Sequence, residues 1–89
     1  MGDGEGTTTR EEDDRTEAAV LLRLLDLHPT MPRVEDLVRE IGGGEDDFAA
    51  RDAVERALRE LAAAGLVHRE RELVTPTRAA LRFDELIDL

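Results

Sequence analysis

Arginine supplies all of the positive charge in this sequence, and its placement is the first chemical feature to explain. The chain holds twelve arginines and no lysine. Arg51, Arg56 and Arg59 fall within one predicted helix, and Arg69 and Arg71 follow in a short polar run. A guanidinium presents several N–H donors in one plane, a geometry that matches carboxylate and phosphate groups. These arginines are therefore the side chains best suited to bind a ligand.

Acidic residues stand beside each of these arginines. The predicted helix also contains Asp52, Glu55 and Glu60, so three positive and three negative charges give it a net charge of zero. The later run, "RERE" over 69–72, alternates the two charges. Pairing between arginines and acids three or four residues apart on a solvated helix face is the alternative to ligand binding.

No set of residues in the sequence is typical of an enzyme. The chain has no Cys and no Ser, and its glycine-rich run "GGGEDD" lacks the Lys and Ser or Thr of a phosphate-binding loop. His28 and His68 are the only imidazoles, and their spacing does not suit a metal site. We therefore expect a protein that is not an enzyme and that holds no metal and no cofactor.

The composition indicates one small, acidic domain. The 89 residues carry a net charge of −10, and only two of them are aromatic, so we expect an aliphatic core. No apolar run approaches the roughly 18 residues that cross a bilayer. The start, "MGDGEGTTTREEDD", lacks the basic and apolar regions of a signal peptide. These features predict a cytoplasmic protein that does not contact membranes.

The acidic charge is concentrated at the N-terminus. Residues 1–17 hold seven acids and two arginines, a net charge of −5 and half of the total. Residues 1–13 contain no apolar residue after Met1, so they cannot bury enough surface to offset the entropy of ordering. We predict a disordered acidic tail over 1–13, which solubilises the protein, screens a basic surface or contacts a partner, and a folded domain over 14–89.

Hydrophobic periodicity predicts two helices in the first half of the domain. The first begins with a capping box formed by Asp14 and Glu17 and ends before Pro29. The second covers "VEDLVREI", with apolar residues at helical spacing, and ends at the glycines 42–44. Between them, residues 31–33 are predicted to be extended and to serve as a short third strand.

The second half of the domain predicts a helix, a hairpin and a further helix. The third helix is capped by Asp46 or Asp47 and ends at Gly65. The run "LVHRERELVT" then predicts two short strands joined by a turn at "RERE". The last helix is predicted to have Thr75 as its N-cap and Pro76 at its first position. The fold class is therefore mainly α with a small β-hairpin.

This order of elements resembles the winged helix–turn–helix family of small prokaryotic transcription regulators. The resemblance covers about residues 16–88 and is centred on the run "VERALRELAAAGLVHR". It implies a three-helix core, a two-stranded wing and a C-terminal helix. The residues that carry it are apolar positions and one glycine: Val54, Ala57, Leu58, Leu61, Gly65, Leu66 and Val67.

The resemblance implies double-stranded DNA as the partner and transcription regulation as the function. The third helix would enter the major groove and the wing would contact the backbone. The alternative is a winged-helix module that binds another protein and no DNA, because carboxylates near the arginines would repel phosphate. The implied DNA contacts are charged or polar residues of the third helix and the wing: Arg51, Asp52, Glu55, Arg56, Arg59, His68, Arg69 and Arg71.

The first and last helices carry more apolar residues than one small core needs. Family members of this size usually dimerise through their terminal helices, so the resemblance implies a homodimer. The apolar residues expected at its interface are Leu22, Leu27, Phe83, Leu86 and Ile87.

Overall fold

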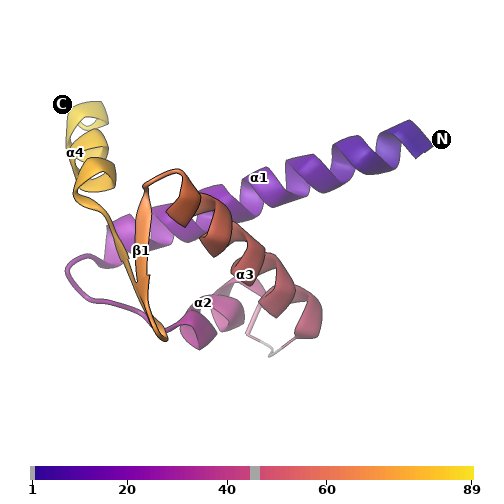
Figure 1. Ribbon diagram of the computed structural model, residues 1–89, viewed down its shortest axis with the longest axis horizontal. Helices are drawn as coiled ribbons and strands as arrows, with labels where there is room; N and C mark the ends of the chain where they lie inside the picture. Colours follow the sequence, from indigo (N-terminus) through magenta and orange to yellow (C-terminus); the bar gives the residue numbers. More distant parts are fainter. Residues whose placement is uncertain (1, 45–46) are drawn as a thin grey trace.

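The part of the chain that the structure describes forms four helices and one hairpin (Figure 1), which confirms the mainly helical fold class predicted from the sequence. The computed structural model describes residues 2–44 and 47–89, and it describes side chains from residue 10 onward. The elements, in chain order, are α1 (Gly2–Leu27), α2 (Val34–Ile41), α3 (Phe48–Ala63), β1 (Val67–Glu70), β2 (Leu73–Pro76) and α4 (Arg78–Ile87).

A single aliphatic core lies where α1, α2 and α3 meet, and the hairpin closes one side of it. Leu24 of α1, Leu37 of α2, Leu58 of α3 and Val74 of β2 are almost completely buried. Each such side chain contributes roughly 1.5–3 kcal/mol through the removal of apolar surface from water. Both aromatic residues lie outside this core, as the composition predicted. The core fixes the orientation of α3, whose opposite face remains exposed.

Helix α1 is longer than the sequence predicted. It begins at Gly2, whereas disordered chain was predicted over residues 1–13 and a capping box at Asp14, which instead lies within the helix. Extending an existing helix requires no new nucleation, and acidic residues near its N-terminus interact favourably with the helix dipole. Figure 1 shows the first turns of α1 projecting past α3. The division into an acidic tail and a domain of residues 14–89 stays a prediction.

The buried stripe of α1 matches the predicted one in part. Helical spacing predicted a face of Ala18, Leu21, Leu24 and Leu25, widened by Val20, Leu22 and Leu27. Leu24 and Val20 are buried in the core, whereas Ala18 is exposed. Because apolar residues occupy a wide arc of this helix, periodicity alone could not decide which part of the arc would be covered.

Helix α2 has the predicted bounds, and the extended segment before it joins the hairpin. The third strand expected over 31–33 is reduced to a single antiparallel bridge between Arg33 and Leu73. The amide of Val34 also donates to the carbonyl oxygen of Glu72 at 2.8 Å. These bonds tie the start of α2 to β2.

Helix α3 is capped as the sequence predicted. The Asp47 side chain accepts a hydrogen bond from the amide of Ala49 at 2.9 Å, while Asp46, the other predicted cap, lies outside the described residues. The helix ends at Ala63, and Gly65 then adopts a φ of 80°, a backbone conformation that glycine reaches without steric cost. The chain turns there into β1.

The hairpin turn is tighter than the predicted "RERE" turn. Arg69 and Glu70 belong to β1, and Glu70 pairs with Leu73, so the loop contains only Arg71 and Glu72. The prediction was wrong because charged residues in an exposed antiparallel ladder resemble turn residues in composition. Their place in the strand depends on pairing with the second strand.

Helix α4 begins two residues later than predicted. The expected cap, Thr75, and Pro76 both belong to β2, so Thr77 is the N-cap. The Thr77 hydroxyl accepts from the amide of Ala80 at 3.2 Å and donates to the carbonyl oxygen of Gly65 at 2.7 Å. Thr75 and Thr77 both have a side chain that can cap a helix. Because the strand ladder extends through Pro76, Thr75 lies within β2 and only Thr77 is left to cap the helix.

Candidate nucleic-acid interface

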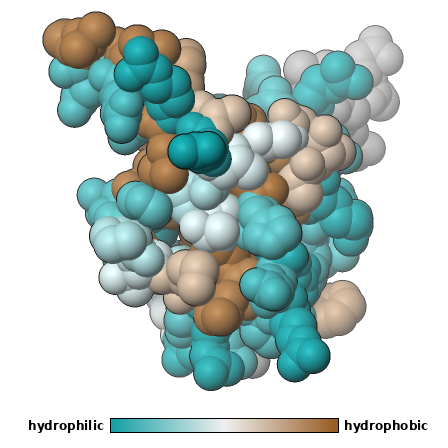
Figure 2. All heavy atoms as spheres, turned by 60° about the vertical axis from the view of Figure 1, so that its left-hand side comes forward, coloured by the Kyte–Doolittle hydropathy of each residue, from teal (hydrophilic) through white to brown (hydrophobic). Residues whose placement is uncertain are grey.

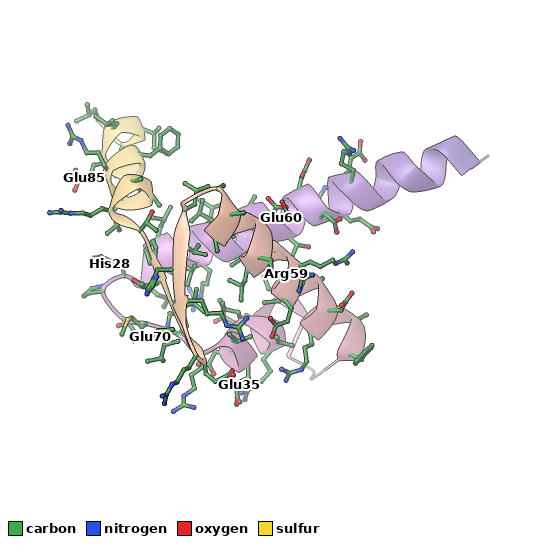
Figure 3. The ribbon with its side chains drawn as sticks, in the orientation of Figure 1. His28, Glu35, Arg59, Glu60, Glu70 and Glu85 are labelled. Atoms are coloured by element: carbon green, nitrogen blue, oxygen red, sulfur yellow. The ribbon has the colours of Figure 1, made fainter. Side chains whose placement is uncertain are left out.

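Helix α3 presents a polar face on the side opposite its buried stripe. The stripe is formed by Val54, Ala57, Leu58 and Leu61, whose burial prevents the helix from rotating about its axis. Figure 3 shows Arg59 and Glu60 on α3, with Glu60 directed toward α1. The exposed side chains on the opposite face include Phe48, Asp52, Arg56 and Arg59.

Arg56 lies between two carboxylates. Its Nε atom is 3.7 Å from Oδ2 of Asp52 on the same helix, and its Nη2 atom is 3.6 Å from Oδ1 of Asp13 on α1. The pair with Asp52 is the four-residue spacing weighed from the sequence. The pair with Asp13 was not predicted, because that residue was placed in a disordered tail. Both distances are ion-pair contacts that are longer than hydrogen bonds.

Arg69 joins the hairpin to α3. Its Nη1 atom donates to Oε1 of Glu55 at 2.6 Å, and its Nε atom donates to the carbonyl oxygen of Arg71 at 2.9 Å. The hydrogen bond with Glu55 raises the pKa of Arg69 above its usual value, partly opposed by burial. The sequence balanced Arg69 against its neighbour Glu70, whereas the observed partner is 14 residues away. No local pattern could have indicated this pair.

Arg51 lies on another side of α3, where α3 approaches α2. It lines a surface groove of about 350 Å³ together with Glu35, Arg39 and Gly44. Arg39 is 3.6 Å from carboxylate oxygens of Glu35 and Asp36. Arg39 was not among the predicted binding residues, and its position follows from the packing of α2 against α3.

Two arginines lie at the tip of the hairpin, Arg71 from its turn and Arg33 from the segment before α2. Arg71 occupies the first position of the two-residue turn with a φ of 59°. The bridge to Leu73 brings Arg33 to the same place, and a groove of about 530 Å³ there is lined by Arg33, Arg71 and neighbouring hairpin residues. His68, farther along β1, is exposed. Arg33 escaped the sequence analysis because it lies outside both the third helix and the hairpin.

The predicted binding residues therefore do not share one surface. Asp52, Arg56 and Arg59 share the exposed face of α3, Arg51 lies toward α2, and Arg71 is at the hairpin tip. Glu55 and Arg69 bind each other between the two elements. The role of these residues in DNA binding stays a prediction.

Four of the five residues expected at a dimer interface are exposed, one of them on α1 and three on α4. Leu22, Phe83, Leu86 and Ile87 are exposed, while Leu27 is half-buried. Within α4, all of which is described, only Ala80 is buried. Figure 2 shows hydrophobic side chains at the outer end of α4, beside hydrophilic ones, where the helix projects from the body of the molecule.

Two further properties concern only the described residues, 2–44 and 47–89. Within them, none of the helices combines the length and the apolar character required to cross a membrane. Among the side chains that the structure describes, those of residues 10–44 and 47–89, no three His, Asp or Glu are grouped as metal ligands. Comparisons with models of protein families, with curated proteins and with solved structures found no match to this chain. Its function is therefore inferred from its own geometry.

Proposed function

We propose that the protein is a DNA-binding transcription regulator of the winged helix–turn–helix type. In this proposal α2 and α3 form the helix–turn–helix, and β1 and β2 form the wing. The observation that carries the proposal is the arrangement in Figure 1, where the N-terminal end of α3 and the hairpin tip lie at the same end of the molecule with α2 between them. A recognition helix and a wing must reach one duplex together, and this arrangement suits that requirement.

Each arginine has a role in this proposal that follows from its position. Arg56 and Arg59 would contact guanine edges or phosphates from the exposed face of α3, and Arg51 would contact the backbone. Arg71 would contact phosphate from the hairpin tip. Arg69 would position the wing through Glu55, because its guanidinium already donates two hydrogen bonds within the protein.

The backbone at Arg71 supports the proposed role of the hairpin tip. A non-glycine residue in the left-handed region costs roughly 1–2 kcal/mol, and glycine is preferred at such a turn position. An arginine retained there despite that cost is typical of a residue kept for its side chain.

A second candidate function is a winged-helix module that binds a protein. The charges favour it: α3 has a net charge of zero, and Glu35 and Glu70 lie at the same end of the molecule as the hairpin tip (Figure 3). Phe48, at the start of α3, is 86% exposed and offers an apolar contact to a protein surface. In this candidate the acidic chain addresses a basic partner.

Binding to a fluorescently labelled duplex of mixed sequence, measured across a KCl series, tests the first proposal. Phosphate contact predicts an affinity that falls with salt, with a log–log slope of about −0.9 for each phosphate neutralised. We expect the double variant Arg56→Ala/Arg59→Ala to lose binding. The control Arg78→Ala/Arg82→Ala removes the same charge from α4, away from α3, and should retain most of it.

The series extends from low salt to molar KCl, because high salt screens the acidic excess of the chain. Absence of duplex binding over the whole range would exclude the first proposal and favour the protein-binding module. Equal losses in the two double variants would show that only net charge matters, and would exclude α3 as the reading element.

We also propose that the protein acts as a homodimer through α1 and α4. The support is the exposed apolar surface of Leu22, Phe83, Leu86 and Ile87, which one copy of the chain leaves uncovered. A helix with a single buried residue gains little stability from its own domain, and packing against a second copy would supply it.

A further inference from the structure

A groove of about 380 Å³ lies between the middle of α1, residues 10–17, and α3. The ion pair between Asp13 and Arg56 spans it. The groove is therefore closed on one side by the acidic helix and on the other by the helix proposed to read DNA. Its charged lining residues are Arg10, Asp13, Asp14 and Glu17 from α1, and Arg56, Arg59 and Glu60 from α3.

The side chains that α1 contributes make the net charge of this groove negative, although the side chains from α3 alone are net positive. Two arginines and one glutamate give the α3 side a net charge of +1, whereas three carboxylates and one arginine give the α1 side a net charge of −2. The complete lining therefore carries a net charge of −1. A phosphate group approaching Arg56 or Arg59 from this side meets the carboxylates of α1 first.

The carboxylates lie close enough to one another, and to α3, to interact. Burial raises the pKa of Glu17, and the neighbouring charges of Asp14, Glu60 and Asp13 raise it further. A carboxyl group with a raised pKa is less stable in its ionised form when the protein is folded. Neutralising Asp13 and Asp14 therefore relieves their repulsion of Glu17, and the fold should remain intact.

We propose that the acidic segment 10–17 of α1 restrains DNA binding by occupying Arg56 and shielding the α1-facing side of α3. The inference rests on the proposed DNA-binding function and describes how that same surface is regulated. Asp13 stands where a phosphate oxygen would pair with the Arg56 guanidinium. Because the contact is an exposed ion pair at 3.6 Å, it is weak enough to be displaced, and phosphate must compete with it.

The double variant Asp13→Asn/Asp14→Asn tests the restraint in the full-length chain. It neutralises two carboxylates that line the groove while keeping the size of both side chains. An exposed ion pair contributes enough to change an affinity by up to roughly five-fold. We expect the variant to bind a labelled duplex of mixed sequence about five-fold more tightly than the native chain at low salt.

The matched control is Glu11→Gln/Glu12→Gln. It removes the same two charges from the same helix, at exposed positions that do not line the groove. A general effect of net charge would strengthen binding equally in both double variants. A restraint at the groove requires a clearly larger gain from the Asp13 and Asp14 substitutions.

To complete the test, both double variants are made again in a chain that also carries Arg56→Ala, and duplex binding is measured in the same way. If Asp13 acts through Arg56, the gain from the Asp13 and Asp14 substitutions should largely disappear in that background. Equal gains in the two double variants, or a gain that survives Arg56→Ala, would overturn the restraint while leaving DNA binding established. Absence of duplex binding in every variant would overturn both the restraint and the proposed function.

Discussion

Arg71 shows how a single residue connects backbone conformation with a proposed role. It begins the two-residue turn between β1 and β2 with a φ of 59°, and its carbonyl oxygen accepts a hydrogen bond from Arg69. Glycine would adopt this backbone conformation with less strain than arginine. The proposed DNA contact, however, requires the guanidinium group. Stability and function therefore favour different residues here.

The substitution Arg71→Gly removes both the strain and the charge at the hairpin tip. We expect the free energy of unfolding to rise by about 0.5–1 kcal/mol, because relief of roughly 1–2 kcal/mol exceeds the entropic cost of glycine. Urea unfolding followed by circular dichroism measures this change, since the chain has no Trp or Tyr to report by fluorescence.

The comparison variant is Arg71→Ala, which loses the same charge but keeps the left-handed conformation. It should show no gain in stability, while both variants should weaken duplex binding to a similar extent. A glycine variant less stable than the native chain would contradict the assignment of strain to Arg71.

Among the elements, the hairpin depends most on a contact that is distant in sequence. The ion pair between Arg69 and Glu55 fastens β1 to α3, and each side chain is about one third exposed, at 31% and 32%. Partial burial reduces screening by water, so this pair should contribute more than a fully solvated one. The pair adds to the core contacts of Val67 and Val74, which also hold the hairpin against the helices.

A double-mutant cycle with Arg69→Ala and Glu55→Ala measures that contribution. We expect a coupling free energy of about 1 kcal/mol, because the bond is short and joins two charged groups. The Arg82–Glu85 pair on α4, with side chains 68% and 67% exposed, serves as the reference and should give less than about 0.5 kcal/mol. A coupling no larger than the reference would mean that the core alone orients the hairpin.

At the scale of the whole molecule, the apolar surface over α4 is the feature that one chain leaves unexplained. Phe83 is 60% exposed, and α4 contributes only Ala80 to the buried residues. The other aromatic residue, Phe48, is even more exposed but lies at the start of α3. The two phenylalanines therefore allow a matched test of where a second copy binds.

We expect the native chain to be a dimer by light scattering at micromolar concentration and Phe83→Ser to be largely monomeric. Each buried Phe contributes roughly 1.5–3 kcal/mol, and a symmetric dimer loses two, so its dissociation constant should increase at least about 100-fold. Phe48→Ser should remain dimeric. A monomeric native chain would contradict the homodimer, and dissociation by Phe48→Ser would place the interface at α3.

The sequence by itself determined the elements whose signals are local. Apolar residues at helical spacing predicted α2, an acidic cap at Asp46 or Asp47 predicted the start of α3, and Gly65 predicted its end. These features depend on interactions within a few residues, so one stretch of chain contains all of their physical causes. For the same reason, the sequence could place the candidate arginines on one helix and one hairpin.

Only the tertiary structure decided how those residues are partnered. The length of α1 brings Asp13 to Arg56, strand pairing confines the turn to Arg71 and Glu72, and packing brings Glu55 to its partner in the hairpin. Each of these outcomes depends on residues far apart in sequence, whose approach is set by the common core. Local composition describes the charges of this protein, whereas the fold determines which of them a ligand can reach.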